Sequence, residues 1–351
     1  MAQRKTGLPT RVLVMGLGRG NAFVNAALNS RELELAGIID LDAERLKRVA
    51  ADWQLRPEQL FTSLAQARSA GPADLLVIAT PTHLHADHVV AGFQAGMHVL
   101  CEKPLVTTRL QAHRLSTAAR RYRRRLAVVQ NMRFNPLARR CRELLAEGAI
   151  GRLNSLEINF HRWRPALKLG HPHAVLFNHG VHHIDLARSI GGGRPLSVEA
   201  SEWDPPWWKQ SRKGHCLRLT ARMSGGWTLC YNASYAEAGR ETPHSGEIRL
   251  AGSAGSLEMG GEIDRDPQLW LHQVKRAVGQ ETRRRIAVET GDWRGMDREL
   301  LEGFSRAIRK GAPWETDLSD NLKSLEILFR AAEYLEGKRA PAARTRRAGK
   351  R

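Results

Sequence analysis

Arg11-Val-Leu-Val-Met-Gly-Leu-Gly-Arg-Gly20 joins a short apolar strand to a glycine-rich turn, and the residues from Ala22 to Leu28 then have helical character. Gly16 permits a tight turn, and Gly18 lets the backbone approach a pyrophosphate at the N-terminus of the following helix. Asn21 stands where the dinucleotide fingerprint has its third glycine, so a side chain there should loosen the packing of helix on strand. The stretch predicts a strand–turn–helix unit that binds a dinucleotide.

Strand and helix signals alternate from residue 11 to about residue 133, which favours a doubly wound parallel sheet. Further strands are expected at 35–39, 74–80, 98–101 and 126–130, with helices at about 84–95 and 107–124. After a helix near 136–147, the segments 153–160, 216–223, 227–234 and 248–250 alternate or cluster as antiparallel strands do. Two late helices are expected at 297–309 and 318–335.

The predicted fold class is therefore an α/β Rossmann domain followed by an α+β domain with a largely antiparallel sheet. The predicted domains are residues 1–133 for NAD binding, residues 134–337 for substrate binding and oligomerisation, and a basic, disordered tail over 338–351.

Asp40 ends the second strand about 20 residues after the glycine turn, where a carboxylate would accept the ribose hydroxyls of NAD. Because its charge would repel a 2′-phosphate, NAD is favoured over NADP. Asp40 could instead be only a turn or cap residue. Arg19 could reach a phosphate and soften this cofactor preference.

Val99-Leu-Cys-Glu-Lys-Pro-Leu105 is an apolar strand that ends in a lysine. Ligands bind at the carboxyl ends of the strands in an open parallel sheet, so Lys103 would lie within reach of a nicotinamide ring. The alternative is an exposed lysine at a strand end. The combination predicts a dehydrogenase.

Five segments resemble the glucose–fructose oxidoreductase, inositol dehydrogenase and MocA family, and the resemblance spans about residues 11–335. They are Asp74-Leu-Leu-Val-Ile-Ala-Thr-Pro81 with His85, Ala95-Gly96, His98-Val-Leu-Cys-Glu-Lys-Pro104, Arg133-Phe-Asn-Pro136 and Asn178-His-Gly-Val-His-His-Ile-Asp185. The resemblance implies a Rossmann domain, a C-terminal sheet domain that often mediates oligomerisation, and NAD(P)-dependent oxidation or reduction of sugars, cyclitols and related compounds.

Carried over by position, the resemblance makes Lys103 the active-site lysine and His182 the catalytic histidine. It also places Thr80, His85 and Glu102 among the cofactor-binding residues. Asn178 occupies the site of the family's usual aspartate, which questions activity, although asparagine is also familiar there in branches acting on nucleotide-linked sugars.

Oxidising a secondary alcohol requires a base for the hydroxyl proton and a group that stabilises the developing alkoxide. His182 suits the first role and Lys103 the second. On a helix beginning near His179, Asp185 would share a face with His182 and could orient the imidazole or bind a substrate hydroxyl. Asn178 could hydrogen-bond the substrate without a charge, or could serve only as a helix N-cap.

Other histidines and arginines have weaker interpretations. His83, His85 and His88 have only Asp87 as a nearby carboxylate, so no metal site is predicted. A further group could line the substrate mouth, where arginines would suit a carboxylate or phosphate group. Its members are Arg162, Arg164, His171 and His173.

The chain of 351 residues carries 55 Lys and Arg against 36 Asp and Glu, a net charge of +19. Seven basic residues fall in 338–351, and a second cluster spans 120–125. Such clusters could attract nucleic acid or anionic substrates, but they are also typical of solvated helix faces. The four cysteines lack paired spacing, and neither a signal peptide nor a membrane span is evident, which predicts a soluble cytoplasmic protein.

The sequence thus predicts an NAD-dependent oxidoreductase that transfers a hydride between nicotinamide and a secondary hydroxyl of a sugar, cyclitol or nucleotide-linked sugar. A homo-oligomer that binds neither membrane nor nucleic acid is expected. Two other functions stay open. Asn178 and the basic tail favour a catalytically silent NAD-binding sensor or partner protein, and the net charge favours a nucleic-acid-associated protein.

Overall fold

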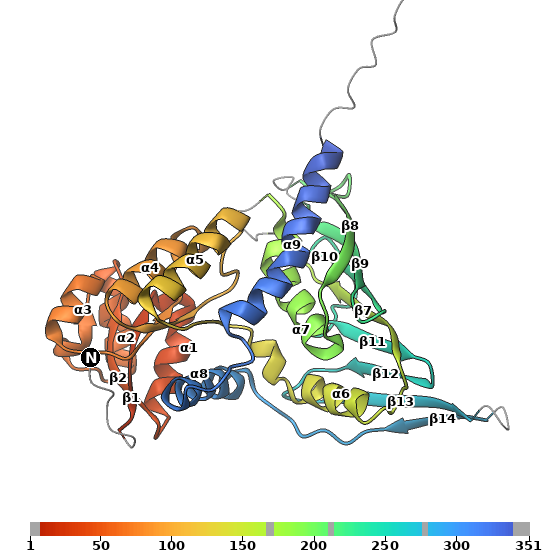
Figure 1. Ribbon diagram of the computed structural model, residues 1–351, viewed down its shortest axis with the longest axis horizontal. Helices are drawn as coiled ribbons and strands as arrows, with labels where there is room; N and C mark the ends of the chain where they lie inside the picture. Colours follow the sequence, from red (N-terminus) through yellow and green to blue (C-terminus); the bar gives the residue numbers. More distant parts are fainter. Residues whose placement is uncertain (1–7, 166–171, 210–213, 276–279, 340–351) are drawn as a thin grey trace, which may run out of the picture.

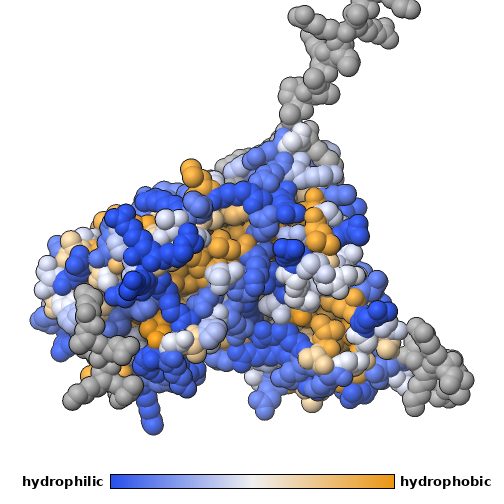
Figure 2. All heavy atoms as spheres, in the orientation of Figure 1, coloured by the Kyte–Doolittle hydropathy of each residue, from blue (hydrophilic) through white to orange (hydrophobic). Residues whose placement is uncertain are grey.

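A computed structural model describes residues 8–165, 172–209, 214–275 and 280–339. Two sheets lie side by side, one in the N-terminal half and one in the C-terminal half, with helices between and around them (Figure 1). Hydrophilic residues cover most of the face shown in Figure 2, and apolar residues gather where the two halves meet.

The first sheet has six parallel strands in the order β3-β2-β1-β4-β5-β6, which confirms the predicted Rossmann topology. All four residues of β4 are buried, because helices cover both faces of a parallel sheet. The strands are β1 Thr10–Met15, β2 Leu33–Ile39, β3 Leu60–Phe61, β4 Leu75–Ile78, β5 His98–Cys101 and β6 Leu126–Val128.

Five α-helices accompany this sheet, and three of them begin at a side-chain cap. Asp42, Ser63 and Thr108 each accept a hydrogen bond from a backbone amide in the first turn. The helices are α1 Leu17–Leu28, α2 Ala43–Asp52, α3 Leu64–Ala70, α4 His85–Gln94 and α5 Arg109–Tyr122. Short 3₁₀ segments lie at η1 Pro57–Gln59, η2 Thr82–Leu84 and η3 Asn131–Phe134.

The basic cluster 120–125 ends α5 and has structural partners. The Arg124 guanidinium donates to the Gly96 carbonyl, and Arg125 forms an ion pair with Asp317 at 2.8 Å. These two contacts agree with the interpretation of the cluster as part of a helix end.

The second sheet has eight strands in the order β14-β13-β12-β11-β7-β10-β9-β8. Only β7 and β10 pair in parallel, so the sheet is largely antiparallel, as predicted. Buried and exposed positions alternate along β9 and β10, because one face packs on helices. The strands are β7 Leu153–His161, β8 Pro195–Trp203, β9 Cys216–Met223, β10 Thr228–Ser234, β11 Glu247–Gly252, β12 Gly255–Gly260, β13 Gln268–Lys275 and β14 Gln280–Arg285.

The helices α6 Pro136–Ala146, α7 Val181–Gly191 and α9 Leu318–Arg339 lie on the side of this sheet that faces the first half (Figure 1). A π-helical turn, η4 Leu176–Gly180, leads directly into α7. The turn and α7 therefore stand between the two sheets.

Helix α8, Trp293–Lys310, follows the second sheet in sequence but packs against α1 of the first half. The Thr10 and Ser305 hydroxyls lie 2.6 Å apart, and Arg309 forms an ion pair with Glu32 at 2.6 Å. The end of α8 therefore lies at the edge of the Rossmann sheet where β1 and β2 begin.

None of the helices in the described ranges is long and apolar enough to cross a membrane. All four cysteines are free thiols.

Candidate active site

The turn between β1 and α1 needs glycine at Gly16 and leaves open space at Gly18. Gly16 has φ +85°, and a Cβ there would lie 2.7 Å from the backbone of Ala79 at the end of β4. A Cβ on Gly18 would meet nothing within 4 Å. At Gly16 the turn therefore lies close to the backbone that follows β4. At Gly18 it leaves open space at the N-terminus of α1.

The expectation that Asn21 loosens the helix–strand packing is wrong. Gly20 provides the close packing instead, since a Cβ there would lie 3.1 Å from Val14 Cγ1. Asn21 turns toward α2, where its side-chain oxygen accepts a hydrogen bond from Trp53 Nε1 at 2.6 Å. The glycine that lets α1 pack closely on β1 is therefore Gly20, one position before the third glycine of the fingerprint.

Asp40 follows β2 at the same edge of the sheet. Its carboxylate accepts hydrogen bonds from the amides of Leu17 at 2.8 Å and Asp42 at 3.0 Å. Burial opposes its charge, but these amides and the Arg45 guanidinium lower the pKa of Asp40 overall. Arg45, which the sequence analysis overlooked, is half-exposed and lies 3.2 Å from Asp40, so it offsets the charge that favours NAD over NADP.

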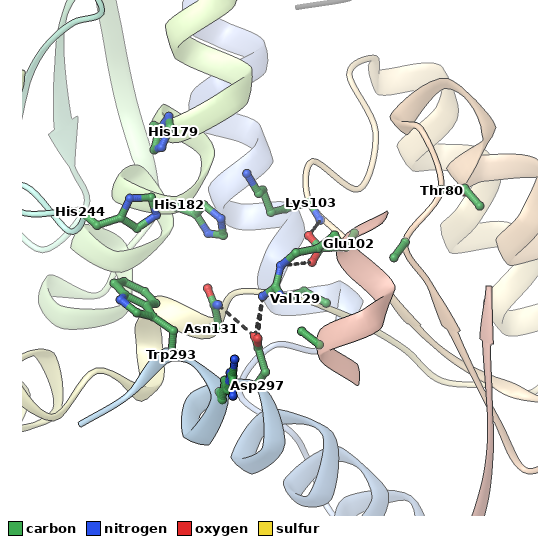
Figure 3. A pocket seen from close by; sticks show the side chains of 14 residues that line it. Thr80, Glu102, Lys103, Val129, Asn131, His179, His182, His244, Trp293 and Asp297 are labelled. Atoms are coloured by element: carbon green, nitrogen blue, oxygen red, sulfur yellow. Dashed lines mark hydrogen bonds and ion pairs between the residues drawn. The ribbon is translucent and has the colours of Figure 1, made fainter. Parts of the chain in front are cut away.

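A cavity of about 540 Å³ opens beside this turn and is lined by both halves of the chain (Figure 3). The residues that line it are Arg19, Ala22, Ala79, Thr80, Glu102, Lys103, Val129, Asn131, His179, His182, His244, Trp293, Arg294 and Asp297. The structure therefore brings together five residues singled out in the sequence. These are Arg19, Thr80, Glu102, Lys103 and His182.

His182 projects from α7, and its Nδ1 lies 3.2 Å from the side-chain oxygen of Gln130 at the end of β6. An amide oxygen only accepts, so this contact places the ring proton on Nδ1 and leaves Nε2 with a lone pair. Burial, reinforced by the nearby Lys103, lowers the pKa of His182 well below its usual value. The ring is therefore neutral at physiological pH, with Nε2 unprotonated.

Lys103 reaches across from the end of β5 to the second half of the chain. Its ammonium donates to the backbone carbonyl of Asn178 at 3.1 Å. Burial lowers the pKa of Lys103, while the neighbouring Glu102 opposes that change. Lys103 and His182 lie next to each other although they come from different halves (Figure 3).

Asn178 lies within the π-helical turn, so its interpretation as an N-cap is wrong; α7 begins at Val181 with Gly180 before it. The Asn178 side chain hydrogen-bonds the hydroxyl of Tyr235. That side chain is absent from the cavity lining, and only its carbonyl meets Lys103.

The role predicted for Asp185 does not fit the structure. Its carboxylate is 1% exposed and accepts hydrogen bonds from Arg133 at 2.6 Å and Ser324 at 2.5 Å. The side chain therefore joins α7 to η3 and α9, and Gln130 takes the place predicted for Asp185 beside His182.

His85 does not make the predicted cofactor contact either. Its two ring nitrogens lie 2.9 Å from the Pro104 carbonyl and 2.8 Å from the Thr80 carbonyl. Because the ring is buried and bound on both sides, His85 holds together the loops that carry Thr80 and Lys103.

Three further histidines surround His182. Burial above all lowers the pKa of His179 to about 2, of His183 to about 3 and of His244 to about 4. His179 and His183 belong to a motif already singled out, whereas no sequence pattern marks His244. The ring of His244 stands 5.0 Å from that of Trp293, centroid to centroid.

Arg19 binds protein carboxylates within the cavity. It lies 2.7 Å from Asp297 and 3.3 Å from Glu102, and Asn131 also donates to Asp297. The sequence analysis missed Trp293, Arg294 and Asp297, because the helix that carries them is distant in sequence.

The predicted arginines of the substrate mouth are not cavity-lining residues. Arg162 and Arg164 both pair with Glu241, at 2.6 and 3.0 Å. His173 pairs with Glu202, and His171 lies outside the described residues. Within the described ranges, no cluster of three or more His, Cys, Asp or Glu side chains could hold a metal ion.

Residues 10–130 match the model of an oxidoreductase family with an NAD-binding Rossmann fold, and residues 138–258 match the C-terminal domain of the same family. The chain is 25% identical to the rhizopine catabolism protein MocA of Rhizobium meliloti, over 93% of this chain and 95% of that protein. It is 30% identical to inositol 2-dehydrogenase of Corynebacterium glutamicum, over 54% and 56%.

Among solved structures, the chain superposes on the WlbA dehydrogenase of Bordetella pertussis in complex with NADH and UDP-GlcNAcA. The TM-score is 0.78 at 21% identity, covering 95% of this chain and 97% of the other. Both domain models and the shared fold lead to one conclusion. The chain belongs to the Gfo/Idh/MocA family of NAD-binding oxidoreductases.

Proposed function

We propose that this protein is an NAD-dependent dehydrogenase that transfers a hydride between nicotinamide and a secondary hydroxyl of a sugar, cyclitol or nucleotide-linked sugar. The observation that carries the proposal is the meeting of Lys103 and His182 in one cavity beside the glycine turn. Relatives that act on inositol or bind a sugar nucleotide support the substrate class.

The residues at the sheet edge fit a dinucleotide. Gly18 faces open space at the start of α1, where the helix N-terminus attracts a pyrophosphate, and Asp40 stands where ribose hydroxyls would be bound. The nicotinamide ring, when bound, supplies or accepts the hydride. Thr80 and Glu102 line the same cavity and would border the cofactor.

The proton chemistry follows from the contacts of His182 and Lys103. With its proton on Nδ1, His182 offers Nε2 to accept the proton of the substrate hydroxyl. Lys103 donates a hydrogen bond to the same oxygen and stabilises negative charge that develops on it. Gln130 holds the ring in the required orientation.

Replacement of Lys103 tests this function directly. Nicotinamide absorbance is followed with NAD and a panel of inositols, aldoses and nucleotide-linked sugars. Lys103→Ala should lower turnover by about 10²-fold or more, because it removes a charge aimed at the reacting oxygen, and should leave NADH affinity unchanged. Full activity of Lys103→Ala would disprove the assignment.

A catalytically silent NAD-binding protein is the second candidate, favoured by Asn178 at the family's aspartate position. It predicts that NADH binds, that the whole panel gives no turnover and that His182→Ala changes nothing. If the panel is silent, Asn178→Asp is the informative variant, because it places the family's usual residue at this position.

A further inference from the structure

The charges of the cavity are unevenly distributed between its two ends. Its lining holds the cations Arg19, Lys103 and Arg294 and the carboxylates Glu102 and Asp297. Both carboxylates lie against Arg19, at 3.3 and 2.7 Å. The carboxylates of the cavity therefore gather around Arg19, at the end next to the glycine turn.

The other two cations have no such partner. Within the described residues, neither Lys103 nor Arg294 has a carboxylate oxygen within 4.0 Å. Lys103 donates only to the Asn178 carbonyl, and Arg294 is exposed in the first turn of α8. The lining thus holds three cations and two carboxylates, an excess of one positive charge, and Arg294 is the cation with no carboxylate beside it among the described residues.

The remaining polar walls at this end add no negative charge. His179, His182 and His244 are neutral at physiological pH, because burial lowers the pKa of each. The Asn178 side chain carries no charge and does not line the cavity. A partly enclosed cleft with charges of one sign concentrates the potential felt by a ligand.

Helix α8 contributes Trp293, Arg294 and Asp297 to the cavity. The ring of its neighbour Trp293 stands against that of His244, which stands 5.2 Å from that of His179, centroid to centroid. Asp297, one helical turn further along α8, reaches Arg19 at the cofactor end. Arg294 lies between Trp293 and Asp297 on α8 and lines the same cavity as these histidines.

We propose that the substrate is a polyhydroxy carboxylate, such as a sugar acid, whose carboxylate pairs with Arg294 while its reacting hydroxyl lies between Lys103 and His182. The inference rests on the proposed dehydrogenase function and specifies its substrate class. A planar guanidinium binds a carboxylate through two parallel hydrogen bonds, which orients the substrate as well as holding it.

The test compares sugars that differ only by a carboxylate. Glucuronate against glucose, and galacturonate against galactose, are titrated calorimetrically into the NADH complex of the full chain. The acids should bind about ten-fold tighter or better, and 0.5 M salt should weaken the difference. Equal affinity within each pair, or no binding of the acids, would overturn the proposal.

Variants then locate the charge. Arg294→Gln should reduce acid affinity about ten-fold without altering NADH affinity, while Arg294→Lys should retain part of the preference. Arg298→Gln is the matched control, because it removes the same charge from an exposed, non-lining position of α8. If Arg294→Gln weakens NADH and not the acids, the residue serves the cofactor and the proposal is wrong.

Turnover separates this inference from the function on which it rests. Acids that bind through Arg294 but are not oxidised with NAD would overturn the dehydrogenase function and leave the acid site standing. Equal kcat/KM for acids and neutral sugars would overturn the acid site and leave the dehydrogenase function standing.

Discussion

The imidazole of His182 has two nitrogens, and the one turned toward Gln130 is Nδ1. A side chain that contacts neither substrate nor cofactor thereby sets which nitrogen is free. Gln130 is 1% exposed, and among the described residues its amide nitrogen has no hydrogen-bond partner, so its side-chain contact is the one from its oxygen to His182. We interpret Gln130 as a positioning residue.

Gln130→Leu should lower kcat by about 10- to 100-fold with little change in KM, because the ring loses its orientation. Gln130→Glu should keep the acceptor and raise the pKa of His182, which moves the acid limb of kcat/KM to higher pH. Steady-state kinetics over pH 5–9 measures both effects. An unchanged pH profile in Gln130→Glu would refute the positioning role.

Sequence patterns identified Lys103 and His182 because each lies in a local motif that implies its chemistry. Gln130, His244 and Arg294 had no such context, since each is a single side chain from a separate segment. Only packing brings them together. Asp185 was misjudged because spacing of three residues on a helix gives a shared face, not a partner.

The turn between β1 and α1 offers a matched pair of glycine substitutions. Gly16→Ala should destabilise the fold by about 1–3 kcal/mol, because the residue has a positive φ and its Cβ would meet Ala79 at 2.7 Å. Gly18→Val should leave stability unchanged and weaken NADH binding, because its side chain would fill the open cradle. Urea unfolding without cofactor and NADH titration separate the two effects. Equal losses of stability would contradict this assignment.

The Asp185 carboxylate ties α7 to η3 and α9 through Arg133 and Ser324. Asp185→Ala should cost about 3–5 kcal/mol, because it leaves the buried Arg133 with one carboxylate fewer. Thermal unfolding measures this loss. A raised substrate KM without loss of stability would instead restore the substrate-binding role predicted from the sequence.

The expected strands and helices lie within a few residues of the observed ones, whereas α2, α3, β3, β8, β12, β13 and β14 were missed. β3 has only two residues. β8 and β14 are the outer strands of the second sheet, and edge strands carry polar or charged residues that weaken the alternating pattern. β14 contains three consecutive arginines, Arg283 to Arg285, which resemble a solvated segment.

The whole protein should lose stability on acidification because its buried histidines resist protonation. The pKa values of His179, His183 and His244 are about 2, 3 and 4, below the value of about 6.5 for an unfolded chain. Between pH 6.5 and 4 the unfolded state thus binds protons that the folded state does not. Each histidine should remove about 1.4 kcal/mol of stability per pH unit over its window, so the three together should remove about 4 kcal/mol per pH unit.

Urea unfolding at pH 7.5, 6 and 5 measures this slope. His244→Gln should make the slope of the unfolding free energy against pH shallower by the contribution of one histidine, about 1.4 kcal/mol per pH unit. A free energy of unfolding that stays constant from pH 7.5 to 5 would show that the cluster takes up protons in the folded state.

Helix α8 completes a wall of the cofactor cleft but is made long after the sheet that it covers. During synthesis, β6 at Leu126–Val128 precedes the end of α8 at Lys310 by roughly 180 residues. At ~5–20 residues per second, the nascent Rossmann sheet would wait on the order of ten to forty seconds with the α8-facing side of α1 uncovered. A ribosome-bound chain that ends before Trp293 should therefore lack Asp297 as the partner of Arg19. Tight dinucleotide binding should begin only when α8 has been made and has packed against α1.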